Sequence, residues 1–264
     1  MKKPRLIVSD IDGTLIPYGY GSLPRELAET VRELRRRGII FCPASGRQYH
    51  SMRVLFREIA DEIYYISENG GAVYSNGPEE SAKLISKTEM PRDTALQIGR
   101  DISSIENTYV IISGIRSSYI LSETESLFAG PMKGLGNKLT VVDRVEDIEE
   151  PIVKLAAYCP VDLNAAGDIL RPKWADKVNM ACAGPTWWDF TLADKGKGLF
   201  ALMSELGIES DEVAAFGDNW NDAPMLRVAG RPYIMESASG ELRAMFRNVC
   251  SDVLEKIREL TGIA

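Results

Sequence analysis

The feature that most constrains the fold is a short apolar run at residues 6–8 that leads directly into two carboxylates, Asp10 and Asp12. Short apolar runs that end in a turn are typical of strands buried on both faces, as in a parallel sheet. Two unit charges about 4 Å apart repel by about 4 kcal/mol at an effective dielectric near 20, so this placement is costly. A bound divalent cation would offset that cost, and Gly13 lets the backbone turn sharply beside a ligand. The alternative is an aspartate-rich turn whose carboxylates are solvated.

Strands and helices are predicted to alternate at both ends of the chain, and such alternation indicates a parallel sheet with helices on both faces. Strands are expected at 6–9, 39–42, 63–66, 213–216 and 233–235, with a hairpin strand at 72–74. Helices are expected at 24–37, from the turn at 43–47 to about 59, and at 198–206 and 223–228, with two more after 235.

The alternation is lost in the middle of the chain, where 109–112 and 118–121 predict an antiparallel pair. We therefore predict an α/β fold, a Rossmann-like doubly wound parallel-sheet core with an inserted α+β cap domain. The core is expected to be discontinuous, formed by residues 1–82 and 189–264, and the cap is expected to comprise residues 83–188.

Composition excludes several classes of partner. The formal net charge of −7 argues against nucleic acid and anionic membranes. No apolar run approaches the roughly 18 residues of a membrane span, and the first residues do not resemble a signal peptide. The four cysteines lack metal-ligand spacing, so we expect buried, reduced thiols in a cytoplasmic protein.

Two further polar spots lie next to predicted elements of the core. Ser45, Gly46 and Arg47 come after the second strand and are expected to open a helix, where a hydroxyl and main-chain N–H groups suit an anion; the alternative is an ordinary helix cap. Lys195 stands just ahead of a helix, where its charge would neutralise a phosphoryl oxygen, and Lys197 is its rival. The alternative is a solvated lysine, which the helix dipole disfavours at this position.

The last polar spot is at residues 217–222, after the strand at 213–216. Asp218 at the strand end is a candidate metal ligand, and Asp222 is expected either to ligate directly or to support the ligands. Asn221 is expected to hold the substrate or Asp218. The alternative is an Asx-rich turn that caps the helix at 223–228. Because open parallel sheets bind ligands at the carboxyl ends of their strands, these spots are expected to converge.

The motifs Asp-x-Asp-Gly-Thr-Leu at 10–15 and Gly-Asp-x-x-Asn-Asp at 217–222, with Ser45 and Lys195 between them, resemble those of the haloacid dehalogenase-like hydrolases. The large insert between Ser45 and Lys195 resembles that of the Cof-like type IIB group, which carries a C2-type cap. Two departures are minor: Ile11 replaces the commoner Leu, and Gly71 lengthens the usual Glu-Asn-Gly-Ala.

The resemblance implies that Asp10 attacks phosphorus and that Asp12 serves as acid and base. It also implies Mg²⁺, ligated by Asp10, the main-chain carbonyl of Asp12 and Asp218, with Asp222 as a further candidate. Lys195 is implied to act in catalysis by holding phosphoryl oxygens. The residues expected to bind substrate are Thr14, Ser45, Gly46, Arg47, Asn69 and Asn221.

The function predicted from the sequence is a Mg²⁺-dependent phosphatase for small phosphorylated metabolites, sugar phosphates above all, acting through an aspartyl phosphate as a monomer or small homo-oligomer. A phosphomutase of the same superfamily is one alternative. Another is a non-catalytic regulatory protein that binds phosphorylated metabolites, although such a binder has no use for Asp12. No motif identifies the substrate, and specificity is expected in the cap.

Overall fold

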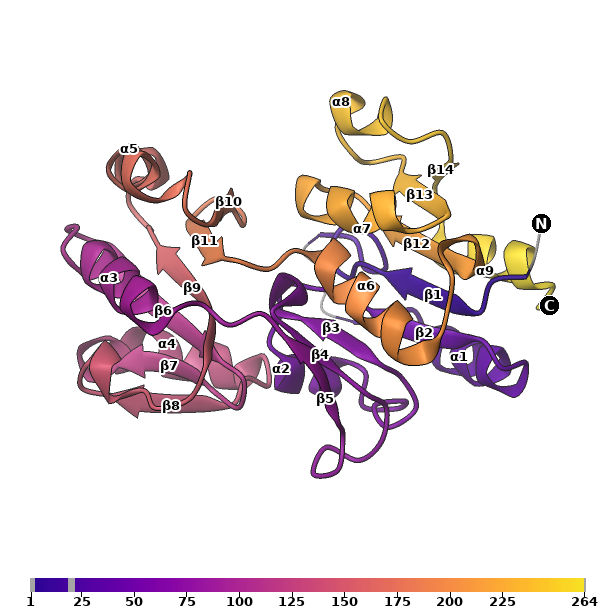
Figure 1. Cartoon of the computed structure of the whole chain (residues 1–264), viewed down its shortest axis with the longest axis horizontal. Coiled ribbons are helices and arrows are strands. Elements are labelled where there is room, and N and C mark those ends of the chain that lie inside the picture. Colours follow the sequence, from indigo (N-terminus) through magenta and orange to yellow (C-terminus); the bar gives the residue numbers. More distant parts are fainter. Residues whose placement is uncertain (1–2, 19–21, 264) are drawn as a thin grey trace. The chain divides into compact units, whose positions relative to one another are not determined.

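The computed structural model describes residues 3–18 and 22–263 and divides into two compact units (Figure 1). The core unit comprises the chain up to Ser86 together with the chain from Asp194 onward. The insert unit comprises Lys87–Ala193.

The centre of the core unit is a five-stranded sheet with the order β14-β13-β12-β1-β2, in which every pairing is parallel. Its strands are β1 (Leu6–Ser9), β2 (Ile40–Pro43), β12 (Val213–Gly217), β13 (Arg231–Met235) and β14 (Val249–Cys250). From β1 the chain moves outward to β2, whereas from β12 it moves outward in the opposite direction to β13 and β14. The strand order therefore reverses between β1 and β12, the place where doubly wound sheets bind ligands.

Helices pack on this sheet because most residues of its strands are apolar. Leu6 and Val8 of β1 share a hydrophobic cluster with Leu199 and Leu202 of α6 and with Met225 of α7. The amphipathic α1 packs along β2 and against α9 (Figure 1). The core helices are α1 (Leu27–Arg36), α2 (Tyr49–Leu55), α6 (Lys195–Leu206), α7 (Ala223–Val228), α8 (Gly240–Arg243) and α9 (Val253–Thr261).

The third predicted strand differs from expectation. It forms β3 (Tyr65–Ser67) of a separate three-stranded sheet, with β4 (Ala72–Tyr74) and β5 (Leu84–Lys87). One parallel bridge, Ala44 to Ile66, joins it to the chain just after β2. Because β3 pairs antiparallel with β4, it forms one arm of a hairpin instead of extending the parallel sheet.

The insert unit is a six-stranded sheet with the order β10-β11-β9-β6-β7-β8, antiparallel except between β7 and β8. The predicted antiparallel pair is confirmed as β6 and β7. Helices α3 and α5 share a hydrophobic cluster with one face of this sheet, and Phe128 of α4 packs on residues of the other. The elements are α3 (Arg92–Ser103), β6 (Tyr109–Gly114), β7 (Ser118–Leu121), α4 (Glu125–Gly134), β8 (Leu139–Val142), β9 (Ile152–Tyr158), α5 (Leu163–Trp174), β10 (Asn179–Cys182) and β11 (Trp187–Thr191).

The α/β fold with a parallel core and an α+β insert is thus confirmed, but one expectation about the cysteines is wrong. Cys42, Cys159 and Cys250 are buried free thiols, whereas Cys182 is exposed because it ends the edge strand β10. Among residues 3–18 and 22–263, no helix is long and apolar enough to cross a membrane.

Candidate active site

Three buried aspartates meet where the strand order reverses. Asp10 follows β1, and its main-chain N–H donates to the carbonyl of Phe216 in β12 (2.9 Å), which ties the two strand ends together. Asp218 follows β12, and Asp222 lies in the short 3₁₀ turn Trp220–Asp222. One carboxylate oxygen from each aspartate lies within 4.8 Å of the other two, so the predicted acidic cluster is assembled.

Lys195 reaches this cluster from the first turn of α6. Its side chain is fully buried, and Nζ donates to Asp10 Oδ1 (2.5 Å) and to Asp222 Oδ1 (2.6 Å). Burial alone would lower the pKa of this lysine, but the two carboxylates more than offset that effect and raise it. Lys197, its rival in the sequence, is exposed. Lys195 is therefore the cation of the site, and it is held in its charged form.

Asp222 is immobilised by several donors. Its Oδ2 accepts hydrogen bonds from the main-chain N–H groups of Asp218 (2.9 Å) and Asn219 (3.0 Å), while its Oδ1 accepts from Lys195. A Cβ at position 217 would lie 2.5 Å from the Asp222 side chain, so only glycine fits there. The Gly-Asp-x-x-Asn-Asp spacing thus folds the loop back onto its own last carboxylate.

Asp218 is held by hydroxyl groups of the loop that follows β1. Thr14 Oγ1 donates to Asp218 Oδ1 (2.8 Å), and Tyr18 Oη donates to Asp218 Oδ2 (2.9 Å). Burial raises the pKa of Asp218, and these two hydroxyls act in the opposite direction. Thr14 was among the residues predicted for substrate binding, and in this structure it contacts a candidate metal ligand.

The cluster carries more negative charge than its single lysine neutralises. Burial raises the pKa of Asp10 well above its usual range; the neighbouring carboxylates of Asp222 and Asp218 add to this, and Lys195 opposes it. Within the described part of the chain, Asp10 Oδ2 is buried and has no hydrogen-bond partner. A hard divalent cation fits this donor set, because it takes oxygen ligands and would satisfy the orphaned oxygen.

Asp12 lies at the edge of the cluster and makes a two-pronged ion pair. Arg47 Nε donates to Asp12 Oδ2 (2.8 Å), and Arg47 Nη2 donates to Asp12 Oδ1 (2.6 Å). This is the fork geometry in which arginine recognises a carboxylate best, and both side chains are partly exposed. Arg47, which was predicted to contact substrate, fixes the orientation of the predicted acid and base in this structure.

The loops after β2 and β3 are tied together beside the cluster. The Asn69 N–H donates to the Ser45 carbonyl (2.9 Å), and the Asn69 side chain lies over Gly46 and accepts from Asn221 Nδ2 (3.2 Å). Asn69 has a left-handed φ of 54°, a conformation common at functional loops. Ser45 does not cap α2, as one alternative had it: the cap is Gln48, and Ser45 Oγ accepts from the Arg47 N–H (3.2 Å).

The predicted residues therefore form connected groups in the core unit. The sequence did not reveal Tyr18, because a largely exposed tyrosine in a glycine-rich loop carries no pattern. The pairing of Arg47 with Asp12 was also missed, since two loop conformations must be known to place them together. Only the conformation of the folded loops distinguishes an arginine that binds a phosphate from one that binds a carboxylate.

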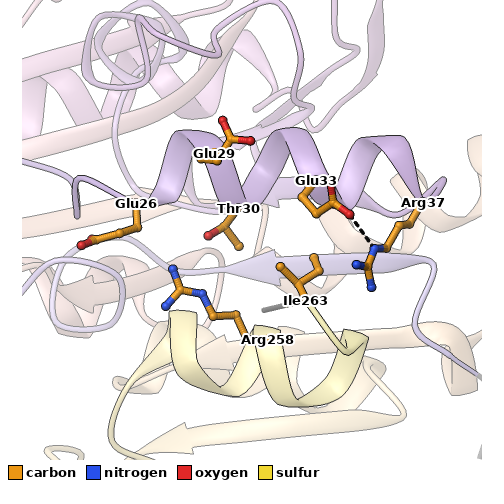
Figure 2. Close-up of a pocket in the computed structure, with 7 residues that line it drawn as sticks. All are labelled: Glu26, Glu29, Thr30, Glu33, Arg37, Arg258 and Ile263. Atoms are coloured by element: carbon orange, nitrogen blue, oxygen red, sulfur yellow. Dashed lines mark hydrogen bonds and ion pairs between the residues drawn. The ribbon is translucent and has the colours of Figure 1, made fainter.

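A hollow of about 360 Å³ in the core unit lies between α1 and α9 (Figure 2). Two of its charged residues pair with each other: Arg37 donates to Glu33 (2.8 Å), and it also donates to the carbonyls of Thr261 (3.1 Å) and Gly262 (3.0 Å). Its lining includes none of the predicted site residues, so it lies outside the candidate active site. The lining residues are Glu26, Glu29, Thr30, Glu33, Arg37, Arg258 and Ile263.

The chain is similar to known proteins over most of its length. A family model described as haloacid dehalogenase-like hydrolase matches residues 7–256. The chain is 27% identical over 249 residues to the 5-amino-6-(5-phospho-D-ribitylamino)uracil phosphatase YbjI of Escherichia coli (strain K12), covering 91% of this chain and 88% of the relative.

Two further similarities extend over nearly the whole chain. A glucosyl-3-phosphoglycerate/mannosyl-3-phosphoglycerate phosphatase of Methanococcoides burtonii is 25% identical, covering 98% of this chain and 92% of the relative. The crystal structure of a haloacid dehalogenase-like hydrolase from Bacteroides thetaiotaomicron has a TM-score of 0.83 at 21% identity, covering 98% of this chain and 100% of that one.

Proposed function

This chain belongs to the haloacid dehalogenase-like hydrolases and is a phosphatase, and we propose that it uses Mg²⁺ and an aspartyl-phosphate intermediate to hydrolyse small phosphorylated metabolites, sugar phosphates above all. The observation that carries the proposal is the buried cluster of Asp10, Asp218, Asp222 and Lys195, in which Asp10 Oδ2 has no partner among the described residues. A carboxylate oxygen that is buried without a hydrogen-bond partner is costly unless a ligand uses it.

Asp10, Asp218 and the main-chain carbonyl of Asp12 would hold the cation. Asp222 is already committed to two N–H groups and to Lys195, so we assign it to fixing the loop and Lys195 rather than to direct ligation. When bound, Mg²⁺ supplies positive charge that reduces repulsion between a carboxylate nucleophile and an anionic phosphate.

In the first step a carboxylate oxygen of Asp10 forms a bond to phosphorus while the bond from phosphorus to the ester oxygen breaks. The departing oxygen takes a proton from the carboxyl group of Asp12. Arg47 donates to both Asp12 oxygens, so it orients this group in the free enzyme. These hydrogen bonds would have to weaken when Asp12 carries the proton.

In the second step Asp12 takes a proton from water, the water oxygen bonds to phosphorus, and the bond to Asp10 breaks to release phosphate. Two of the three N–H bonds of the Lys195 ammonium point to Asp10 and Asp222, which leaves the third for a phosphoryl oxygen. The Ser45 hydroxyl and the Gly46 N–H are the further groups that we assign to phosphoryl oxygens.

The activities of two relatives support the substrate class. One acts on a phosphorylated ribityl compound and the other on phosphoglycerates that carry a glucosyl or mannosyl group. Asp12 supports hydrolysis over simple phosphate binding, because binding alone requires no acid and base.

The proposal is tested by release of inorganic phosphate from p-nitrophenyl phosphate and from a panel of sugar phosphates, each with Mg²⁺ and with excess EDTA. We expect turnover that requires Mg²⁺ and favours members of the sugar panel. Full activity in EDTA would contradict the role of the acidic cluster. Little net phosphate with isomerised sugar phosphate would identify a phosphomutase, and no turnover of any substrate would identify a binding protein.

A further inference from the structure

Both carboxylate oxygens of Asp218 are held by hydroxyls from one loop. Thr14 donates to Oδ1 (2.8 Å) and Tyr18 donates to Oδ2 (2.9 Å). Because each oxygen accepts one of these hydrogen bonds, the carboxylate cannot rotate freely about its terminal torsion angle, χ2. An aspartate with one such partner would keep much of that freedom.

Gly13 makes this pair of hydrogen bonds to Asp218 possible. Its φ of +97° belongs to a backbone conformation that residues with a side chain rarely adopt. A Cβ at this position would lie 2.4 Å from Asp218 Oδ2 and 2.5 Å from the Tyr18 ring. The missing side chain thus leaves the space in which the tyrosine ring and the carboxylate oxygen meet.

Burial does not explain the orientation of Tyr18. The residue is 62% exposed, so its ring gains little from leaving water. The hydrogen bond from its hydroxyl to Asp218 Oδ2 (2.9 Å) directs the side chain inward. A charge-assisted hydrogen bond of this kind is stronger than one between neutral groups.

We propose that Tyr18 is a positioning residue for metal binding, which fixes the plane of the Asp218 carboxylate so that one of its oxygens faces the cation. The inference rests on the Mg²⁺ dependence proposed above. Each carboxylate oxygen can accept more than one contact. Asp218 can therefore bind a cation while it accepts the hydrogen bonds from Thr14 and Tyr18. Partners that orient metal ligands in this way typically contribute about 10–100-fold to metal affinity.

The effect should differ between cations. Mg²⁺ demands near-ideal octahedral geometry, whereas Ca²⁺ accepts flexible ligands and variable coordination. A carboxylate freed to rotate therefore weakens Mg²⁺ binding more than Ca²⁺ binding. A loss of charge or a general loosening of the fold would weaken both to a similar extent.

The experiment is calorimetric titration of Mg²⁺ and of Ca²⁺ into the metal-free full chain, without substrate, for the wild type and for Tyr18→Phe. The control is Tyr119→Phe, which removes a hydrogen bond between tyrosine and Glu150 in the insert unit. We expect Tyr18→Phe to weaken Mg²⁺ binding about tenfold and Ca²⁺ binding less, while Tyr119→Phe changes neither.

Three results would overturn the inference. Unchanged or tighter Mg²⁺ binding by Tyr18→Phe would mean that Tyr18 does not orient Asp218 for the cation. Equal weakening for both cations would indicate a nonspecific effect. A wild type that binds no Mg²⁺ would remove the cofactor of the proposed function as well, which distinguishes that failure from the first two.

Discussion

Replacing Lys195 with methionine is expected to destabilise the metal-free protein strongly. Lys195 Nζ lies 2.5 Å from Asp10 Oδ1 and 2.6 Å from Asp222 Oδ1, and the lysine is fully buried. Methionine is unbranched and apolar, so it removes the charge with little loss of packing. The substitution therefore leaves two buried carboxylates close together without a compensating cation.

The size of the loss follows from these distances. At an effective dielectric near 20, each ion pair of about 2.5 Å represents about 6–7 kcal/mol of attraction. Most of this is offset by the cost of burying the ammonium, and removing one partner of a buried pair typically costs about 3–5 kcal/mol. For a chain of this size that corresponds to a fall in Tm of about 10 °C.

The assay is urea unfolding in EDTA at pH 7, with Lys197→Met as the matched control because that lysine is exposed and two residues away. The control is expected to change the free energy of unfolding by less than about 0.5 kcal/mol. Added Mg²⁺ should recover part of the loss in Lys195→Met, since it replaces the missing positive charge. A loss below about 1 kcal/mol, or one equal to that of the control, would refute the electrostatic account of the cluster.

Two other perturbations follow from the same site. Burial raises the pKa of Asp10, so above about pH 4 the unfolded state loses this proton before the native state does. In EDTA, the free energy of unfolding of the wild type relative to Asp10→Asn should therefore fall as pH rises above about 4 and level off once native Asp10 has also ionised, and a flat difference would contradict the raised pKa. Asp12→Asn should lower kcat for sugar phosphates by about 10²–10⁴, and less for p-nitrophenyl phosphate, whose leaving group needs less protonation; steady-state kinetics that show no loss for either substrate would make Asp12 structural.

Much of the core fold was predictable, because its strands are apolar runs punctuated by glycine or polar turns. The β1 and β12 segments and the helix Ala223–Val228 were located in this way. The start of α6 was placed three residues late, at position 198, because glycines 196 and 198 hide the helical pattern. The signal that was available is Asp194, whose carboxylate caps the helix by accepting from the Lys197 N–H (2.8 Å).

The site was predictable as far as strand ends determine it. Asp10 and Asp218 converge because adjacent parallel strands, β1 and β12, end at the same edge of the sheet. Contacts made by loops were not predictable, since they depend on torsion angles such as the positive φ of Gly13. The hydrogen bond from Tyr18 to Asp218 and the ion pair between Arg47 and Asp12 are loop contacts of this kind.

The most direct test of the central claim is to identify the residue that carries phosphate during turnover. The enzyme is mixed with substrate and Mg²⁺, quenched, reduced with borohydride, which converts an aspartyl phosphate to homoserine, and digested for mass spectrometry. The account predicts homoserine at position 10, and neither turnover nor homoserine in Asp10→Asn. Homoserine at another position, or undiminished turnover by Asp10→Asn, would contradict it.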